Sequence, residues 1–115
     1  EDEIDLFVEN YKDNEIYVSE KNLHFLEVDS KFDIASTVVT MISKLKSEDS
    51  FVVMQRKDDF VKFSARNQSS SIDMGQLMKR CVEGLDGANG GAHVPAAAAK
   101  IQAKDLDEFK RRLLE

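Results

Sequence analysis

The sequence predicts a single α/β domain, built as a small mixed β-sheet of about four to five strands with helices packed against it. Strand-like and helix-like segments alternate along the chain, and no internal repeat is detectable. The length of 115 residues fits one domain and leaves no room for two independent cores. Apolar residues make up 42% of the chain, which is enough for a packed interior, and the single proline argues against disorder.

The N-terminal part divides into an acidic segment and the start of the domain. Residues 1–14 carry few apolar side chains and are predicted to be a short strand, a short helix or a linker remnant, and residues 15–115 form the domain. Glu15–Val18 and Leu23–Val28 are strand-like and flank a polar turn, which predicts a hairpin. Because the chain begins at Glu1 rather than at methionine, we expect it to be processed or cut from a longer protein.

A helix is predicted over Phe32–Lys46. Its apolar residues recur at the spacing of one helix face and are expected to be buried: Ala35, Val38, Val39, Ile42 and Leu45. Ser30 or Asp33 is expected to cap the start of this helix with its side-chain oxygen. The lysines in its last turn complement the negative end of the helix dipole.

Two strands are predicted to follow this helix as a second hairpin. Phe51–Met54 is a nearly continuous apolar run, typical of a strand that is covered on both faces. After a charged turn at Arg56–Asp59, the segment Phe60–Arg66 alternates between apolar and polar side chains. The apolar set is Val61, Phe63 and Ala65, and the polar set is Lys62, Ser64 and Arg66.

Two amphipathic helices are predicted in the C-terminal half. The first begins after Asp73, which forms a capping-box variant with Gln76. Its apolar stripe consists of Met74, Leu77, Met78, Cys81, Val82 and Leu85. Cys81 is interpreted as a small buried hydrophobic residue, since no histidine or basic group is placed to activate it. Glycines end this helix, and Lys104–Leu114 forms the second, with acidic residues leading and basic residues trailing.

The net charge of −6 is unevenly distributed along the chain. Residues 1–50 contain 5 basic and 13 acidic residues, whereas residues 51–115 contain 11 basic and 9 acidic residues. The overall charge disfavours a general DNA-coating role, but it allows a local anion site in the second half. The first half is otherwise typical of an ordinary acidic cytoplasmic surface.

Several classes of site are excluded or disfavoured. The lone Cys81 excludes an internal disulfide, and with only His24 and His93 no metal site of histidine and cysteine ligands is expected. No paired carboxylates, GxSxG motif or Walker loop is present, so no catalytic residue is assigned in this chain. The apolar runs are shorter than the roughly 18 residues that span a bilayer, and we expect a cytoplasmic protein without a membrane partner.

The segment Gly87–Pro95 is a candidate anion site. Small residues such as Gly90 and Gly91 let the backbone approach a ligand closely, and consecutive amides in such a turn form an anion-binding nest. His93, at the end of this loop, would hydrogen-bond a phosphate oxygen or donate a proton near neutral pH. The alternative is a flexible helix-to-strand connection with one exposed histidine. His24 lies inside a predicted strand and is interpreted as a strand residue.

Arg66 is a second candidate for anion binding. It ends a strand on its polar face and precedes the donor-rich segment Asn67–Ser71. An arginine at this position would clamp a phosphate with two parallel hydrogen bonds. The alternative is a surface arginine paired with Asp73 or another acid.

The ordered features from about Leu23 to Leu114 resemble the DHH-associated C-terminal domain of DHH-family phosphoesterases. This family includes RecJ-like single-strand exonucleases, oligoribonucleases and small-nucleotide phosphodiesterases. The matching motifs are Ser64-Ala65-Arg66, Gly90-Gly91-Ala92-His93, Ala96-Ala97 and Asp105-Leu106-x-x-Phe109. Alanine stands at 92 and 98 where the family has glycine, and an alanine tolerates a positive φ poorly, at a cost of about 1 kcal/mol. The resemblance places a strand at Ala96–Ala99, although an alanine run favours helix by propensity.

What the resemblance implies is a substrate-binding role. In the family, an N-terminal DHH domain holds a divalent metal, and the C-terminal domain grips phosphates across a cleft. The corresponding phosphate-binding residues here are Gly90, Gly91, His93 and Arg66, with Ser64 and Asn67 as neighbours. The Mn or Mg ion is expected in the DHH domain, which these 115 residues lack, so the isolated chain should be inactive, with His93 at most assisting.

Three functional hypotheses follow. The leading one is a domain that binds single-stranded DNA or RNA, or a short oligonucleotide, for a hydrolase such as a RecJ-like exonuclease or oligoribonuclease. The alternative is a non-catalytic protein-interaction module whose acidic first half docks a basic replication or repair partner. A third is a small-nucleotide sensor, which a ligand would stabilise without any oligonucleotide preference.

Overall fold

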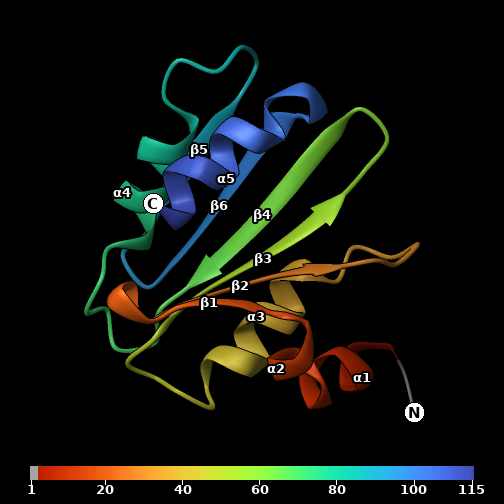
Figure 1. Cartoon of the computed structure of the whole chain (residues 1–115), viewed down its shortest axis with the longest axis vertical. Coiled ribbons are helices and arrows are strands. Elements are labelled where there is room, and N and C mark those ends of the chain that lie inside the picture. The colour runs from red at the N-terminus through yellow and green to blue at the C-terminus, as the bar shows by residue number, and fades with distance from the viewer. Residues whose placement is uncertain (1–2) are drawn as a thin grey trace.

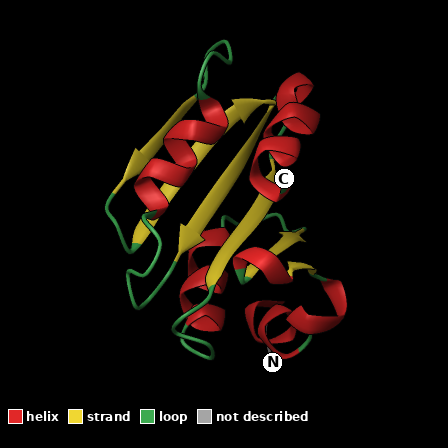
Figure 2. Cartoon of the chain, turned by 60° about the vertical axis from the view of Figure 1, so that its left-hand side comes forward, coloured by secondary structure: helices red, strands yellow, loops and turns green. Residues whose placement is uncertain are grey.

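The computed structural model describes residues 3–115, so the first two residues of the predicted segment 1–14 lie outside the described residues. One mixed sheet has the strand order β1-β2-β3-β4-β6-β5, and helices lie on both of its faces (Figures 1 and 2). The strands are β1 (Ile16–Val18), β2 (Leu23–Val28), β3 (Ser50–Arg56), β4 (Phe60–Arg66), β5 (Asn89–Ala92) and β6 (Ala96–Gln102). The helices are α1 (Glu3–Glu9), α2 (Tyr11–Asn14), α3 (Ala35–Ser43), α4 (Met74–Val82) and α5 (Leu106–Leu114), with 3-10 turns η1 (Ser19–Lys21) and η2 (Ala103–Asp105). The predicted α/β class is confirmed.

Three antiparallel hairpins and one parallel crossover build the sheet. β1 pairs with β2, and β3 pairs with β4, as the sequence predicted. α3 connects β2 to β3, which lie parallel to each other. β6 pairs with the free side of β4, which confirms the strand expected at Ala96–Ala99, and β5 forms the edge beyond it.

The strand β5 is the one strand more than the sequence predicted. It contains Gly90 and Gly91, which were assigned to a loop, and that assignment is wrong. Glycine usually weakens a strand because it adds no side-chain packing. Here β5 pairs along the seven-residue strand β6, and the missing side chains let α4 pack directly against the β5 backbone.

Two apolar clusters lie on opposite faces of the sheet, named here the α3 face and the α5 face. The α5-face cluster joins α4 and α5 to alternating residues of β2, β3, β4 and β6. The α3-face cluster joins α2 and α3 to β2 and β3. β3 contributes Val52 and Met54 to the first and Phe51 and Val53 to the second, as expected for a strand covered on both faces.

The start of α3 is capped by the side chain of Gln55, which is distant in the sequence. Neither Ser30 nor Asp33 caps it, and Asp33 instead forms an ion pair with Lys62. Gln55 of β3 accepts hydrogen bonds at 3.1 and 3.2 Å from the backbone N–H groups of the two residues that open the helix. Because Gln55 lies 20 residues farther along the chain, the predicted local cap was wrong.

Three other predictions concern single residues of the helices. α3 ends at Ser43, so Leu45 lies in the following turn and is 59% exposed, not buried as predicted. Asp73 accepts a hydrogen bond at 3.1 Å from the backbone N–H of Gln76, which confirms the predicted cap of α4. Cys81 is fully buried, and burial raises the pKa of its thiol, as expected for a residue that acts as a small hydrophobe.

The N-terminal segment forms two short helices, α1 and α2, which are separated by a turn at Asn10, and a short helix was one of the forms predicted for it. Tyr11 is only 4% exposed and belongs to the α3-face cluster, so this segment packs on the sheet domain. Within residues 3–115, no helix combines the length and apolar character needed to cross a bilayer.

Candidate functional site

The α3 face of the sheet is open where β4 meets β6. α3 packs across β3 and β4, and the α3-face side chains of β6, such as Ala98 and Lys100, remain exposed. A groove of about 230 Å³ lies between α3 and this open part of the sheet. Its lining residues come from four elements: Ser36, Val39 and Thr40; Ser64, Ala65 and Arg66; Ala92; and Ala96, Ala97 and Ala98.

Two of the predicted site residues, Ser64 and Arg66, lie in this groove. The alternation of β4 directs both side chains to the α3 face, where Ser64 is opposite Ala98 and Arg66 is opposite Ala96 on β6. The alternative pairing of Arg66 with Asp73 is not formed, and among residues 3–115 no carboxylate makes an ion pair with Arg66. The groove therefore contains one cationic side chain over a floor of methyl groups.

Gly90, Gly91 and His93 lie next to the groove rather than in its lining. They precede and follow Ala92, the β5 residue that lines it. His93 is exposed, and its backbone N–H donates to the carbonyl oxygen of Ala96 at 3.0 Å. Ala92 has φ of 132°, so an alanine does occupy a backbone conformation that favours glycine.

Glycine at 90 has a packing role that sequence reasoning missed. A Cβ atom added to Gly90 would lie 2.9 Å from the carbonyl oxygen of Met78 in α4. Gly75 of α4 makes the corresponding contact with β5, since a Cβ atom added to Gly75 would lie 2.9 Å from the carbonyl oxygen of Ala92. A glycine in each partner of a helix–strand contact could have indicated this close packing.

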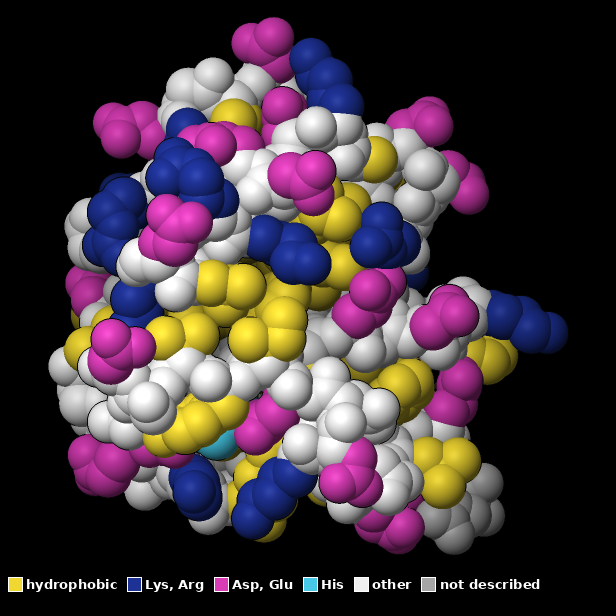
Figure 3. Space-filling view, in the orientation of Figure 1, with side chains coloured by type: hydrophobic (Ala, Val, Ile, Leu, Met, Phe, Trp, Pro, Cys, Tyr) yellow, Lys and Arg dark blue, Asp and Glu magenta, His cyan; other side chains and the backbone are white. Residues whose placement is uncertain are grey.

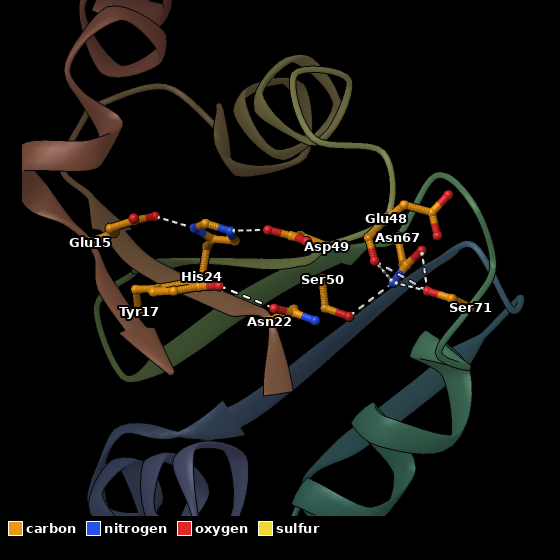
Figure 4. Close-up of polar contacts among 9 residues, drawn as sticks. All are labelled: Glu15, Tyr17, Asn22, His24, Glu48, Asp49, Ser50, Asn67 and Ser71. Carbon is orange, nitrogen blue, oxygen red and sulfur yellow. Dashed lines mark hydrogen bonds and ion pairs between the residues drawn. The ribbon is translucent and has the colours of Figure 1, made fainter. Parts of the chain in front are cut away.

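Asn67 lies outside the groove lining and is fully buried. Its Nδ2 donates to the hydroxyls of Ser50 and Ser71, at 3.1 Å each, and to the carbonyl oxygen of Glu48 at 3.4 Å (Figure 4). Its side chain thus holds together the turn that follows Arg66 and the loop that leads into β3.

A second polar cluster, centred on His24, was not predicted. Nδ1 of His24 lies 2.6 Å from Oε1 of Glu15, and Nε2 lies 2.7 Å from Oδ2 of Asp49 (Figure 4). The imidazole ring stacks on Phe51 with centroids 4.3 Å apart. Burial raises the pKa of the nearby Tyr11 hydroxyl, and the negative charges of Glu15 and Asp49 raise it further. No local sequence pattern indicates this cluster, because its members are 9 and 25 residues apart.

The donor set of the groove suits an anion rather than a divalent cation. Its polar atoms belong to hydroxyls and to the Arg66 guanidinium, and it contains no carboxylate. Across residues 3–115, no group of three or more histidine, cysteine or acidic side chains is arranged to hold a metal ion. Arg66 and the hydroxyls can instead donate hydrogen bonds to a phosphate or carboxylate.

The fold is shared with solved proteins of low sequence identity. RecJ from Thermus thermophilus, solved with Mn²⁺, superposes with a TM-score of 0.70 at 14% identity, over 96% of this chain and 16% of RecJ. The C-Ala domain of alanyl-tRNA synthetase from Aquifex aeolicus gives 0.66 at 16% identity, over 89% of this chain and 99% of that domain. A pGpG-specific phosphodiesterase, PggH from Vibrio cholerae, gives 0.63 at 20% identity, over 95% of this chain and 36% of the enzyme.

The family comparison covers most of the chain. No curated protein matches the sequence. The family model of the DHHA1 domain matches residues 20–115, which include β2 to α5 and therefore both the groove and the α5 face. This chain therefore belongs to the DHHA1 domain family.

Proposed function

We propose that this chain is the substrate-binding domain of a DHH-family phosphoesterase and that its groove holds phosphates of a single-stranded nucleic acid or short oligonucleotide. Membership of the DHHA1 family supports the general assignment. The similarity in fold to RecJ and to a pGpG-specific phosphodiesterase supports a phosphodiester as the ligand. The observation that carries the proposal is the position of Arg66, which lines an alanine-floored groove and has no ion-pair partner among residues 3–115.

Each residue has a defined part in this proposal. The Arg66 guanidinium presents paired N–H donors that match two phosphate oxygens, and the Ser64 hydroxyl donates beside it. The backbone at Gly90 and Gly91 borders the bound phosphate, and His93 hydrogen-bonds the next one. Asn67 acts from outside the groove, because it fixes the turn that begins directly after Arg66.

The chemical step is assigned to the DHH domain of a longer protein. A Mn or Mg ion held by that domain would supply an activated water for phosphodiester hydrolysis. The residues of this chain bind and orient the phosphates, and none of them is assigned to bond cleavage.

A row of basic side chains favours an oligonucleotide over a single nucleotide. Lys62 lies on the same face of β4 as Arg66, about 13 Å away at the usual rise of a strand. Lys100 of β6 is directly opposite Lys62 in the sheet register. Lys62 is paired with Asp33, whereas Lys100, whose Nζ lies over the ring of Phe60, has no ion-pair partner among residues 3–115. Lys100 therefore extends the positive surface beyond the groove, where a second phosphate would lie.

Fluorescence anisotropy with labelled single strands tests the proposal. Wild-type protein is titrated with DNA and RNA from a mononucleotide to a hexanucleotide across a salt series. Arg66→Gln should weaken oligonucleotide binding about tenfold or more and reduce the salt slope by about one. The matched control is Arg56→Gln, which removes the same charge on the α5 face and should leave affinity nearly unchanged. Equal affinities of the two variants, or no binding at low salt, would contradict the proposal.

A further inference from the structure

A second cavity lies on the α5 face, on the other side of the sheet from the groove. Its volume is about 390 Å³, and it shares no lining residue with the groove. Its walls come from the turn η1, from Ile72 in the loop before α4, and from α4 and the end of α5. Figure 3 views the molecule from the side of α5, where apolar surface is bordered by both basic and acidic side chains.

The base of this cavity is apolar. Leu23, Leu77 and Leu113 line it and belong to the α5-face cluster, so they are fixed in position. Ile72 forms part of the wall and is 49% exposed, which leaves a large apolar side chain facing solvent at the entrance. A mostly apolar cavity of this size with a few polar groups is the usual form of a small-molecule site.

Two cationic side chains, those of Lys21 and Arg80, line the cavity and are exposed. Lys21 of η1 donates hydrogen bonds to the backbone oxygens of Leu113, at 3.2 Å, and of Glu115. Arg80 of α4 also lines the cavity, and among residues 3–115 neither it nor Lys21 forms an ion pair with an acidic side chain. Glu20 is the one acidic residue in the lining.

We infer that this cavity binds a small amphipathic anion, with an aromatic or short aliphatic body against the leucines and Ile72 and one acidic group against Arg80 and Lys21. Charge complementarity selects an anion, because the lining contains two basic side chains, Lys21 and Arg80, and one acidic side chain, Glu20. The apolar walls select a ligand with a hydrocarbon body over inorganic phosphate. This site is independent of the proposed function, since Arg66 and its groove lie on the opposite face.

The test uses 2-naphthoate and its neutral counterpart 2-naphthalenemethanol as probes. Binding of each to the full 115-residue chain is followed by backbone amide chemical shifts in NMR and by calorimetry. 2-Naphthoate is expected to shift the amides of Lys21, Leu23, Leu77 and Arg80 and to bind about tenfold more tightly than the alcohol. Equal affinities of the two probes would overturn the charge selection, and shifts confined to other parts of the protein would overturn the site.

Matched variants separate the contributions of charge and apolar contact. Arg80→Gln should weaken 2-naphthoate about tenfold and leave the alcohol unaffected, whereas Ile72→Ser, at an exposed position, should weaken both probes. Lys79→Gln removes the neighbouring charge of α4, which does not line the cavity, and should change neither affinity. Arg66→Gln should also leave both affinities unchanged. If Lys79→Gln weakens 2-naphthoate binding as much as Arg80→Gln does, the binding results from general electrostatic attraction and the proposal is overturned.

Discussion

Gly90 of β5 and Met78 of α4 approach each other so closely that a Cβ atom on Gly90 would lie 2.9 Å from the Met78 carbonyl oxygen. The added Cβ atom would also lie only 3.2 Å from a methyl group of Val82. The obstructing atom is backbone, so it cannot rotate out of the way as a side chain could. The glycine of the family motif at this position is therefore required by the contact between helix and strand.

Gly90→Ala should destabilise the domain by about 1–3 kcal/mol, because the added methyl forces α4 away from β5. Urea unfolding followed by circular dichroism measures this. The control is Gly84→Ala, where a Cβ would meet nothing within 4 Å and only the positive φ of 79° opposes alanine, at a cost of about 1 kcal/mol. A Gly90→Ala variant as stable as the wild type would show that the contact adjusts without cost.

The two alanines that replace family glycines are expected to respond in opposite ways. Ala92 has φ of 132°, and a strained non-glycine conformation costs about 1–3 kcal/mol. Ala92→Gly should therefore raise the free energy of unfolding by roughly 0.5–1 kcal/mol, even after the added chain entropy of glycine.

Ala98→Gly is the matched comparison for Ala92→Gly. Ala98 lies in the middle of β6 without a positive φ, so glycine there only weakens the strand, by roughly 0.5–1 kcal/mol. The measurement is the urea midpoint of each variant in the same buffer. A loss of stability in both variants would mean that Ala92 is not strained.

Features with a local cause could be predicted from the sequence. The alternation of Phe60–Arg66 correctly placed Ser64 and Arg66 on the same face of β4, because strand periodicity depends only on neighbouring residues. Asp73 and Gln76 correctly predicted the cap of α4, since the two groups lie three residues apart. The part of the groove that β4 contributes could be predicted in this way.

Features that depend on distant residues could not be predicted. β5 contains only small and polar residues, and it becomes a strand because β6 and α4 provide its contacts. The cap of α3 by Gln55 requires the α3–β3 connection to be folded first. His24 meets Asp49 only after β2 and β3 pair in parallel. In each case the tertiary structure determines which residue is the contact partner, and the neighbouring residues in the sequence do not indicate it.

His24 is expected to be a structural residue whose removal is costly. His24→Phe keeps an aromatic ring against Phe51 but leaves the carboxylates of Glu15 and Asp49 without their shared partner. Both acidic side chains are largely buried, with 11% and 14% exposed. Leaving buried charges unpaired costs about 3 kcal/mol or more, which urea unfolding would register.

A compensating variant tests the cause of this loss. Adding Glu15→Gln and Asp49→Asn to His24→Phe removes both unpaired charges while nearly preserving side-chain volume. The triple variant should recover about half of the lost stability, since neutral amides are less costly to bury than carboxylates. If the triple variant is less stable than His24→Phe alone, unpaired charge is not the reason for the loss.

Glu108 of α5 provides the clearest pH-dependent group. Hydrogen bonds from Arg111 and then from Arg112 lower the pKa of its carboxyl to about 2. A carboxyl whose pKa is lowered by folding stabilises the folded state above its ordinary pKa of 4.5, and this contribution is lost as the pH falls toward 2. Carboxyl carbon chemical shifts in NMR should therefore show Glu108 still ionised at pH 3.5. Arg111→Gln and Arg112→Gln should each move its midpoint toward 4.5, and Arg111→Gln should move it more, because Arg111 makes the larger contribution. A midpoint that neither variant changes would mean that these arginines do not hold the carboxylate in solution.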